Sequence, residues 1–130
     1  ERYDDAVDQL SRRLQYAQQN GGIEAVRTDY EVAKSEMPAE AFVETALNAL
    51  GYRLLRRGAI EESIEVFRFN TELYPRSGNV FDSLAEALLA SGDMQAALDN
   101  YETSVRLDPG NENGVGMIQV IEARLAAEEQ

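Results

Sequence analysis

Apolar positions recur along this chain with a fixed period. Pro75 and Pro109 stand 34 residues apart, and most apolar positions before each proline recur at the same offset. The matching pairs are Leu50 with Leu84, Leu54 with Leu88, Gly58 with Gly92, Ile64 with Leu98, Phe67 with Tyr101, and Leu73 with Leu107. A period of this length, with two helical patterns per unit split by a glycine, is typical of stacked helical hairpins.

The unit over 78–111 shows two helical stripes. The spacing i, i+3, i+4 and i+7 on the first helix brings together Phe81, Leu84, Ala85 and Leu88. The inner stripe of the second helix consists of Ala97, Leu98, Tyr101, Ser104 and Val105. Between them, Gly92 suits a left-handed residue that ends a helix, and Asp93 can cap the next one. Pro109 then predicts the end of the unit, because proline cannot continue the helical hydrogen bonds.

Residues 44–77 repeat this plan. Gly51 here and Ala85 in the next unit occupy one position, where the second helix of each pair is expected to cross the first. A larger side chain at this position would overpack the contact. Asn70 falls at the same kind of crossing, where we expect it to bond locally.

The two ends of the chain carry looser versions of the pattern. Residues 1–43 predict a divergent first pair, with helices near 3–19 and 23–36 on either side of two adjacent glycines. After Pro109 an amphipathic helix over about 112–128 is expected to cover the end of the stack. Its inner stripe is predicted to be Val115, Ile118, Ile121 and Leu125. The expected divisions within one domain are therefore 1–43, 44–77, 78–111 and 112–130.

The units over 44–77 and 78–111 resemble the tetratricopeptide repeat (TPR). The motif positions are filled by Leu47, Leu50, Gly51, Leu54, Ser63, Phe67, Asn70 and Pro75, and again by Phe81, Leu84, Ala85, Leu88, Ala97, Tyr101, Ser104 and Pro109. Asn70 departs from the motif, which usually has a small apolar residue there. The resemblance implies an all-α fold of antiparallel helical hairpins stacked as a right-handed superhelix, with three pairs and a C-terminal capping helix.

The amino-acid sequences of two segments, 47–55 and 74–84, also resemble repeats found C-terminal to bacterial serine hydrolases of the β-lactamase, penicillin-binding or α/β type. This resemblance implies a non-catalytic C-terminal tail with an attached catalytic domain upstream. The chain begins at Glu1 and not at methionine, so we expect a processed product or an excised piece. A hydrolase tail would be secreted or periplasmic, and a free-standing module would be cytoplasmic.

The residue types needed for catalysis are missing. The chain has no histidine and no cysteine, so a Ser–His–Asp triad and thiolate chemistry are both excluded within it. Neither Gly-x-Ser-x-Gly nor Ser-x-x-Lys occurs. The acidic groups are Asp4, Asp5 and Asp8, whose spacing does not match a calcium loop, and Glu61, Glu62 and Glu65, expected in a solvated helical turn. We expect no enzyme, no cofactor and no metal.

The charge narrows the range of partners. The net charge is −12, and residues 78–130 carry ten acidic and two basic residues. Such a surface repels nucleic acid and anionic membranes. No apolar run approaches the roughly 20 residues of a membrane-spanning helix. The acidity therefore serves either solubility alone or the attraction of a basic partner, and the sequence leaves both open.

Candidate binding positions follow from the TPR resemblance, in which the first helix of each pair lines a concave face. The exposed positions there are Thr45, Asn48, Tyr52, Leu55 and Arg56 in one unit, and Asn79, Asp82, Glu86 and Leu89 in the next. The polar residues and Tyr52 among them are the predicted partner-binding residues. The asparagines offer donors and an acceptor to an extended peptide, and the two acids favour a lysine or arginine on the ligand. The plainer alternatives are asparagines that cap turns, a tyrosine that packs on the first pair, and acids that are only solvated.

These observations predict a module that recognises a protein or peptide. Two alternatives stay open at this point. One is a structural accessory domain of a serine hydrolase. The other is self-association through an apolar stripe formed by Tyr3, Val7, Leu10 and Leu14.

Overall fold

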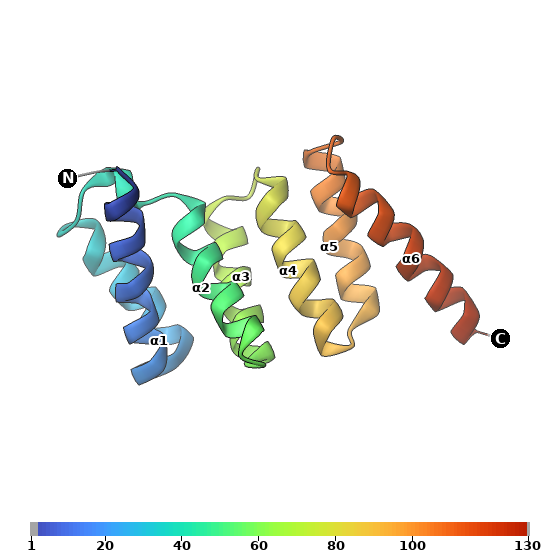
Figure 1. Cartoon of the computed structure of the whole chain (residues 1–130), viewed down its shortest axis with the longest axis horizontal. Helices are drawn as coiled ribbons and strands as arrows, with labels where there is room; N and C mark the ends of the chain where they lie inside the picture. The colour runs from blue at the N-terminus through green and yellow to red at the C-terminus, as the bar shows by residue number, and fades with distance from the viewer. Residues whose placement is uncertain (1–2, 130) are drawn as a thin grey trace. The chain divides into compact units, whose positions relative to one another are not determined.

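The computed structural model describes residues 3–129, with the side chains of 5–129, and this part of the chain is helical without a strand (Figure 1). The elements are α1 (Tyr3–Lys34), the 3-10 turn η1 (Ala39–Ala41), α2 (Glu44–Arg56), α3 (Ile60–Leu73), α4 (Gly78–Ser91), α5 (Met94–Leu107) and α6 (Glu112–Glu128). The predicted all-α class is confirmed. None of the helices among the described residues combines the length and the apolar character needed to cross a bilayer.

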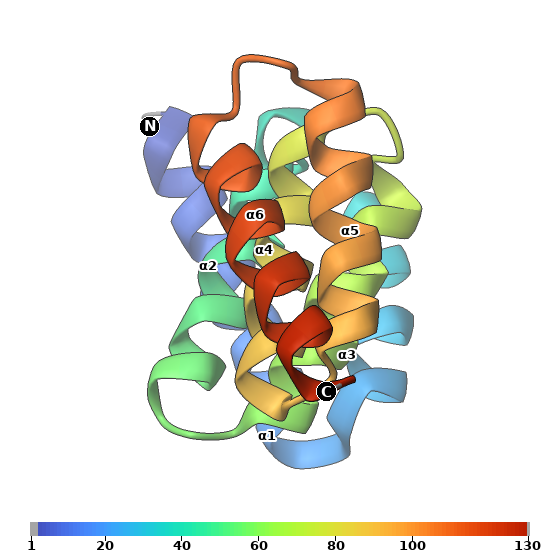
Figure 2. The same cartoon turned by 90° about the vertical axis from the view of Figure 1, so that its right-hand side faces the viewer.

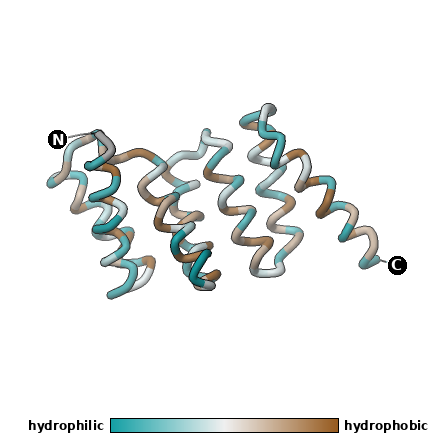
Figure 3. The backbone as a smooth tube through the Cα atoms, in the orientation of Figure 1, coloured by the Kyte–Doolittle hydropathy of each residue, from teal (hydrophilic) through white to brown (hydrophobic). Residues whose placement is uncertain are grey.

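The helices form two compact units, 1–70 and 71–130, and each is described by itself. The division falls within α3. The predicted repeat boundaries at 43/44, 77/78 and 111/112 fall between helices, and the division into repeats stays a prediction. Along the helices of both units, stretches of hydrophobic and hydrophilic residues follow one another, as expected for amphipathic helices (Figure 3).

In unit 1, α1 is a folded-back pair of helices joined at Gly22. The backbone there has φ 69° and ψ −159°, a conformation that is open mainly to glycine. A straight helix would hold residues 16 apart about 24 Å from each other. Instead the Arg13 guanidinium donates two hydrogen bonds of 2.8 Å to the two carboxylate oxygens of Asp29. The predicted first hairpin is therefore present (Figure 1).

The contact between α2 and α3 depends on a glycine. A Cβ atom added at Gly51 would lie 2.3 Å from the ring of Phe67, which is fully buried. The Tyr52 ring meets the same ring in an edge-to-face arrangement, with centroids 5.0 Å apart. Asn70 donates a 3.0 Å hydrogen bond to the backbone carbonyl of Glu44. The predicted close crossing is confirmed, whereas Asn70 bonds across it to α2, 26 residues away in the sequence, and not locally.

The apolar stripe of α1 faces inward. Leu10 and Leu14 have no exposed surface, because α1 packs against α2 and η1. The prediction that Tyr3, Val7, Leu10 and Leu14 form a surface for self-association is therefore wrong for its two leucines, which belong to the core. The side chain of Tyr3 lies outside the described residues.

In unit 2, α4 packs along α5, and α5 packs along α6 (Figure 2). Gly92 ends α4 with φ 93°, and the Asp93 carboxylate accepts a 3.1 Å hydrogen bond from the Ala96 N–H, so both predicted signals are confirmed. The buried Ser104 hydroxyl donates to the Gly78 carbonyl at 2.7 Å and accepts from the Asn111 amide at 2.9 Å. This bridge joins the start of α4 to α5 and to the cap of α6.

The inner face of α6 differs from the prediction at one position. Ile121 is fully buried as expected, but Val115 is 40% exposed. At about 100° per residue, Val115 points roughly 120° away from Ile121, whereas Gly114 lies within about 20° of it. A Cβ atom at Gly114 would lie 2.9 Å from a methyl of Val105, so α6 approaches α5 closely at a glycine.

Replacing Gly51 by alanine tests the crossing of α2 and α3. Alanine in a helix gains up to about 1 kcal/mol over glycine from propensity, while overpacking costs about 1–3 kcal/mol. Because the new Cβ would meet the enclosed Phe67 ring, we expect Gly51→Ala to lower the free energy of unfolding by about 1–2 kcal/mol in urea titrations.

Gly116 in α6 supplies the matched control, since a Cβ atom there meets nothing within 4 Å. Gly116→Ala should raise the free energy of unfolding by about 0.5–1 kcal/mol. An equal gain from Gly51→Ala would show that the two helices do not need the glycine.

Candidate binding surface

The four predicted positions of α2 share one side of this helix in unit 1. Their spacings of three, four and four residues place Thr45, Asn48, Tyr52 and Arg56 in one row. Thr45 and Arg56 are exposed, and Asn48 and Tyr52 are half-buried. Core packing uses the other side of the helix, where Leu47, Leu50, Gly51 and Leu54 are buried.

Asn48 and Tyr52 differ in how free they are. The Asn48 Oδ1 atom is buried and has no hydrogen-bond partner. Because this oxygen is enclosed by the protein, only the remainder of the half-buried side chain can reach a ligand. The Tyr52 ring packs on Phe67 of α3, which fixes its orientation and leaves only part of it exposed.

The three predicted positions of α4 form a second row, in unit 2. Asn79 and Glu86 are exposed, and Asp82 between them is half-buried. The Asn113 amide donates a 3.3 Å hydrogen bond to the Asp82 carboxylate from the first turn of α6. Asn113 was not predicted from the sequence, because only the fold brings the start of α6 to this side of α4.

Burial dominates the electrostatics of Asp82. It raises the pKa of the Asp82 carboxyl above its ordinary value, the nearby Glu86 raises it further, and hydrogen bonds from Asn111 and Asn113 oppose the shift. No arginine or lysine is among the groups that shift this pKa. The ionised carboxylate is therefore held by neutral amides, without a compensating cation, which suits it to meet a positive charge from outside.

Unit 1 also carries a group of arginines, of which only Arg56 was among the predicted site residues. We call Arg12 of α1 together with Arg53, Arg56 and Arg57 at the end of α2 the arginine surface. The pKa of Arg53 is lowered first by burial and then by the positive charges of the other three, and Asp8 opposes this shift. The spacing of Arg53, Arg56 and Arg57 is readable from the sequence, but the approach of Arg12 needs the packing of α1 on α2.

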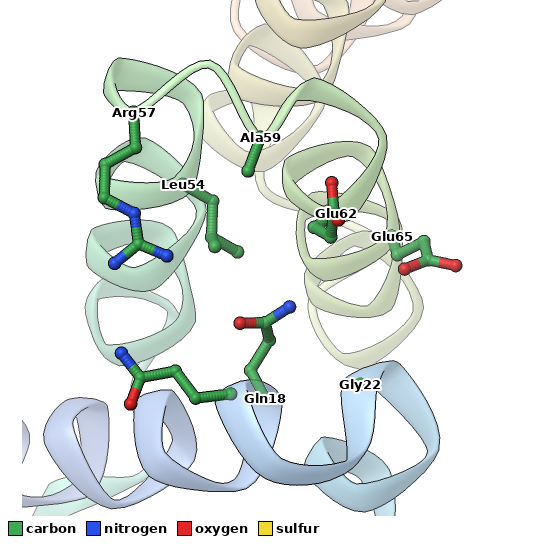
Figure 4. A pocket seen from close by; sticks show the side chains of 8 residues that line it. Gln18, Gly22, Leu54, Arg57, Ala59, Glu62 and Glu65 are labelled. Atoms are coloured by element: carbon green, nitrogen blue, oxygen red, sulfur yellow. The ribbon is translucent and has the colours of Figure 1, made fainter.

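A hollow of about 550 Å³ opens at the end of unit 1 where the turn of α1 meets the turn between α2 and α3 (Figure 4). It is lined by Gln18, Gln19, Gly22, Leu54, Arg57, Ala59, Glu62 and Glu65. Figure 4 shows Arg57 on the α2 side and Glu62 across from it on the α3 side. None of these residues was a predicted site residue, because their meeting depends on how two hairpin turns pack.

The acidic groups considered as metal ligands give no centre. Among the described residues no group of three or more potential ligands is placed to hold a metal ion, and the side chain of Asp4 lies outside them. Glu61, Glu62 and Glu65 are exposed on α3, as expected for a solvated turn.

Comparison with known proteins identifies similar structures but no similar sequences. No family model matches the sequence, and no curated protein matches it. Among solved structures, a mutant of MamA superposes with a TM-score of 0.60 at 16% identity, covering 99% of this chain and 89% of MamA. PcrH from Pseudomonas aeruginosa superposes with a TM-score of 0.56 at 17% identity, covering 97% of this chain and 93% of PcrH. Both are TPR-type proteins, so the chain has a TPR-type fold.

The raised pKa of Asp82 makes a prediction about stability. A carboxyl whose pKa is higher in the folded state than its ordinary 3.8 loses stability as pH rises through that range, because ionisation opposes folding. Asp82→Asn removes this cost and should raise the free energy of unfolding at neutral pH by at most about 1 kcal/mol, since solvent screens a half-exposed group. The gain should shrink toward about pH 3, where the carboxyl is protonated in both states.

Urea titrations at several pH values measure this difference. Glu102→Gln is the control, because it removes one negative charge from an exposed position of α5 in the same unit. A gain of the same size and pH dependence in the control would assign the effect to net charge and not to the burial of Asp82.

Proposed function

We propose that this chain is a non-catalytic protein- or peptide-interaction module of the TPR type. Its partners bind to the exposed rows of α2 in unit 1 and α4 in unit 2, on the side that is concave in the TPR family. The rows consist of Thr45, Asn48, Tyr52 and Arg56, and of Asn79, Asp82 and Glu86. No cofactor takes part in this function.

The observation that carries the proposal is the environment of Asp82. Packing of α4 and α6 removes part of its hydration and supplies two amides, but no cation among the groups that shift its pKa. Groups with perturbed pKa values gather at functional sites more often than elsewhere. A lysine or arginine of a partner would form a charge-assisted hydrogen bond with Asp82 and gain further attraction from Glu86.

The row on α2 offers a different set of groups. Asn48 lies half-buried in this row, and Tyr52 presents a ring already fixed by Phe67. A side chain that is ordered before binding loses little conformational freedom when the ligand arrives. These features support recognition of an extended peptide backbone on this helix.

The two alternative functions stay predictions. The role as an accessory domain of a serine hydrolase rests on the sequences of 47–55 and 74–84. Sequencing the parent gene upstream of Glu1 tests it, because a serine hydrolase motif is expected there. Self-association would need a surface other than the α1 stripe, because Leu10 and Leu14 are buried.

A titration with a basic peptide tests the row on α4. We expect a fluorescein-labelled peptide of alternating lysine and serine to bind the chain. Asp82→Asn with Glu86→Gln should weaken binding about tenfold, since two charge-assisted contacts are lost. The control is Glu102→Gln with Glu122→Gln, which removes the same charge from exposed positions of α5 and α6.

Fluorescence anisotropy gives both affinities under one salt condition. Equal weakening by the control pair would reduce the interaction to non-specific attraction by net charge. Absence of binding by the unsubstituted chain would overturn the assignment of a basic partner to α4.

A further inference from the structure

The basic residues of this acidic protein are concentrated in one part. Nine of its twelve lysines and arginines belong to unit 1, and four of these nine form the arginine surface. Unit 2, with three basic residues, has no counterpart to it. The arginine surface is therefore a local reversal of the charge that the composition predicts.

Two members of the arginine surface have no partner of opposite charge. Arg56 and Arg57 are exposed, and within the described residues neither forms an ion pair. Arg12 pairs with Asp8 one turn away on α1, with both side chains more than half exposed. An exposed pair of this kind contributes little, so the Arg12 guanidinium can exchange Asp8 for another carboxylate at small cost.

Arg53 holds the arginine surface in place. Its guanidinium donates a 2.7 Å hydrogen bond to the Ser11 hydroxyl, which ties α2 to α1. Its Nε atom is buried and has no hydrogen-bond partner. Arg53 thus fixes the two helices that carry the exposed arginines and adds a positive charge beneath them.

The stability of α2 accounts for this arrangement only in part. Arg53 and Arg56 lie in the last turn of α2 and Arg57 is its C-cap, where the helix dipole favours cations and offsets their mutual repulsion. Arg12 belongs to another helix and gains nothing from the dipole of α2. Among the described residues, Asp8 is the carboxylate that opposes the shift of the Arg53 pKa.

We propose that the arginine surface binds an acidic segment of a partner protein, whose carboxylates pair with Arg12, Arg56 and Arg57. The proposal rests on the proposed function, in which the row on α2 is a binding surface, and it assigns to that row a ligand opposite in charge to the one on α4. Guanidinium groups suit this role, because each can hold a carboxylate by two parallel hydrogen bonds.

The row on α2 sets the length of the segment. Asn48 and Arg56 are eight residues apart, about 12 Å along the helix. An extended segment of about four residues covers that distance. Its carboxylates would lie over the arginine surface, and its other end would lie along the half-buried Asn48.

A short acidic segment fits better than a nucleic acid. Thirteen acidic residues share unit 1 with its nine basic ones, so a long polyanion would extend from the arginine surface onto repelling surface. A peptide with a few adjacent glutamates or aspartates ends before it reaches that surface.

The test uses a fluorescein-labelled peptide of six glutamates with an amidated C-terminus, titrated with the full chain. The amide removes the terminal carboxylate, so the carboxylates that can pair with the arginines are those of the glutamate side chains. We expect saturable binding that weakens with added salt, and a loss of at least about tenfold for Arg56→Glu with Arg57→Glu. Arg56→Ala with Arg57→Ala should also weaken binding, and circular dichroism checks that each variant is folded.

Unit 2 supplies the matched control. Arg76→Glu with Arg124→Glu makes the same change in net charge at exposed positions and should leave the affinity within about twofold. An equal loss in the control would overturn the proposal, as would tighter binding of a 16-nucleotide single-stranded DNA than of the peptide. Since the basic-peptide titration involves Asp82 and Glu86, it can fail while this one succeeds, and the reverse also holds.

Discussion

The packing of an aromatic ring against a helix backbone sets the geometry of the pair formed by α2 and α3. Phe67 lies over Gly51 at a distance that excludes even a methyl group, and the ring is completely enclosed. Helices that approach this closely must present their small positions to one another, which fixes their relative rotation. The rotation of α2 then decides which of its residues reach solvent, so the row from Thr45 to Arg56 is a consequence of the Gly51 contact.

In unit 2, helix packing likewise determines the surroundings of the acidic row on α4. Ser104 joins the start of α4 to α5 and to Asn111, and Asn111 caps α6 through the Gly114 N–H. This arrangement brings the first turn of α6 against Asp82 and removes part of its water. The cap that fixes the start of α6 therefore also changes the surroundings of the Asp82 carboxylate. The rows on α2 of unit 1 and α4 of unit 2 carry local charges of opposite sign.

The sequence predicts those features that depend on local chemistry or on the repeat period. The ends of helices at Gly58 and Gly92, the cap at Asp93 and the crossing at Gly51 follow from residue type and spacing. The error at Val115 comes from helix rotation. Spacings of three and four residues placed Val115 on the inner face of α6, but successive steps of three drift around the helix, and Gly114 lies closer to the direction of Ile121.

Contacts between segments distant in the chain were harder to predict. The stripe of α1 is apolar whether it faces a second copy or its own neighbour α2, and only the fold shows that Leu10 and Leu14 face inward. The arginine surface needs Arg12 beside α2, and the hollow needs two turns to meet. Neither arrangement can be predicted from the spacing of residues along one helix.

Buried polar atoms that lack a hydrogen bond are concentrated in and near α2. Among the described residues, the buried side-chain atoms without a hydrogen bond are Asn48 Oδ1, Arg53 Nε and Asn70 Oδ1. The first two belong to α2, and the Asn70 amide bonds its first residue, Glu44. Each unpaired atom costs about 1–3 kcal/mol, which a sequence selected for stability alone would avoid with apolar side chains. Two of the three unpaired atoms in the described part of the chain therefore belong to the helix that carries the proposed binding row.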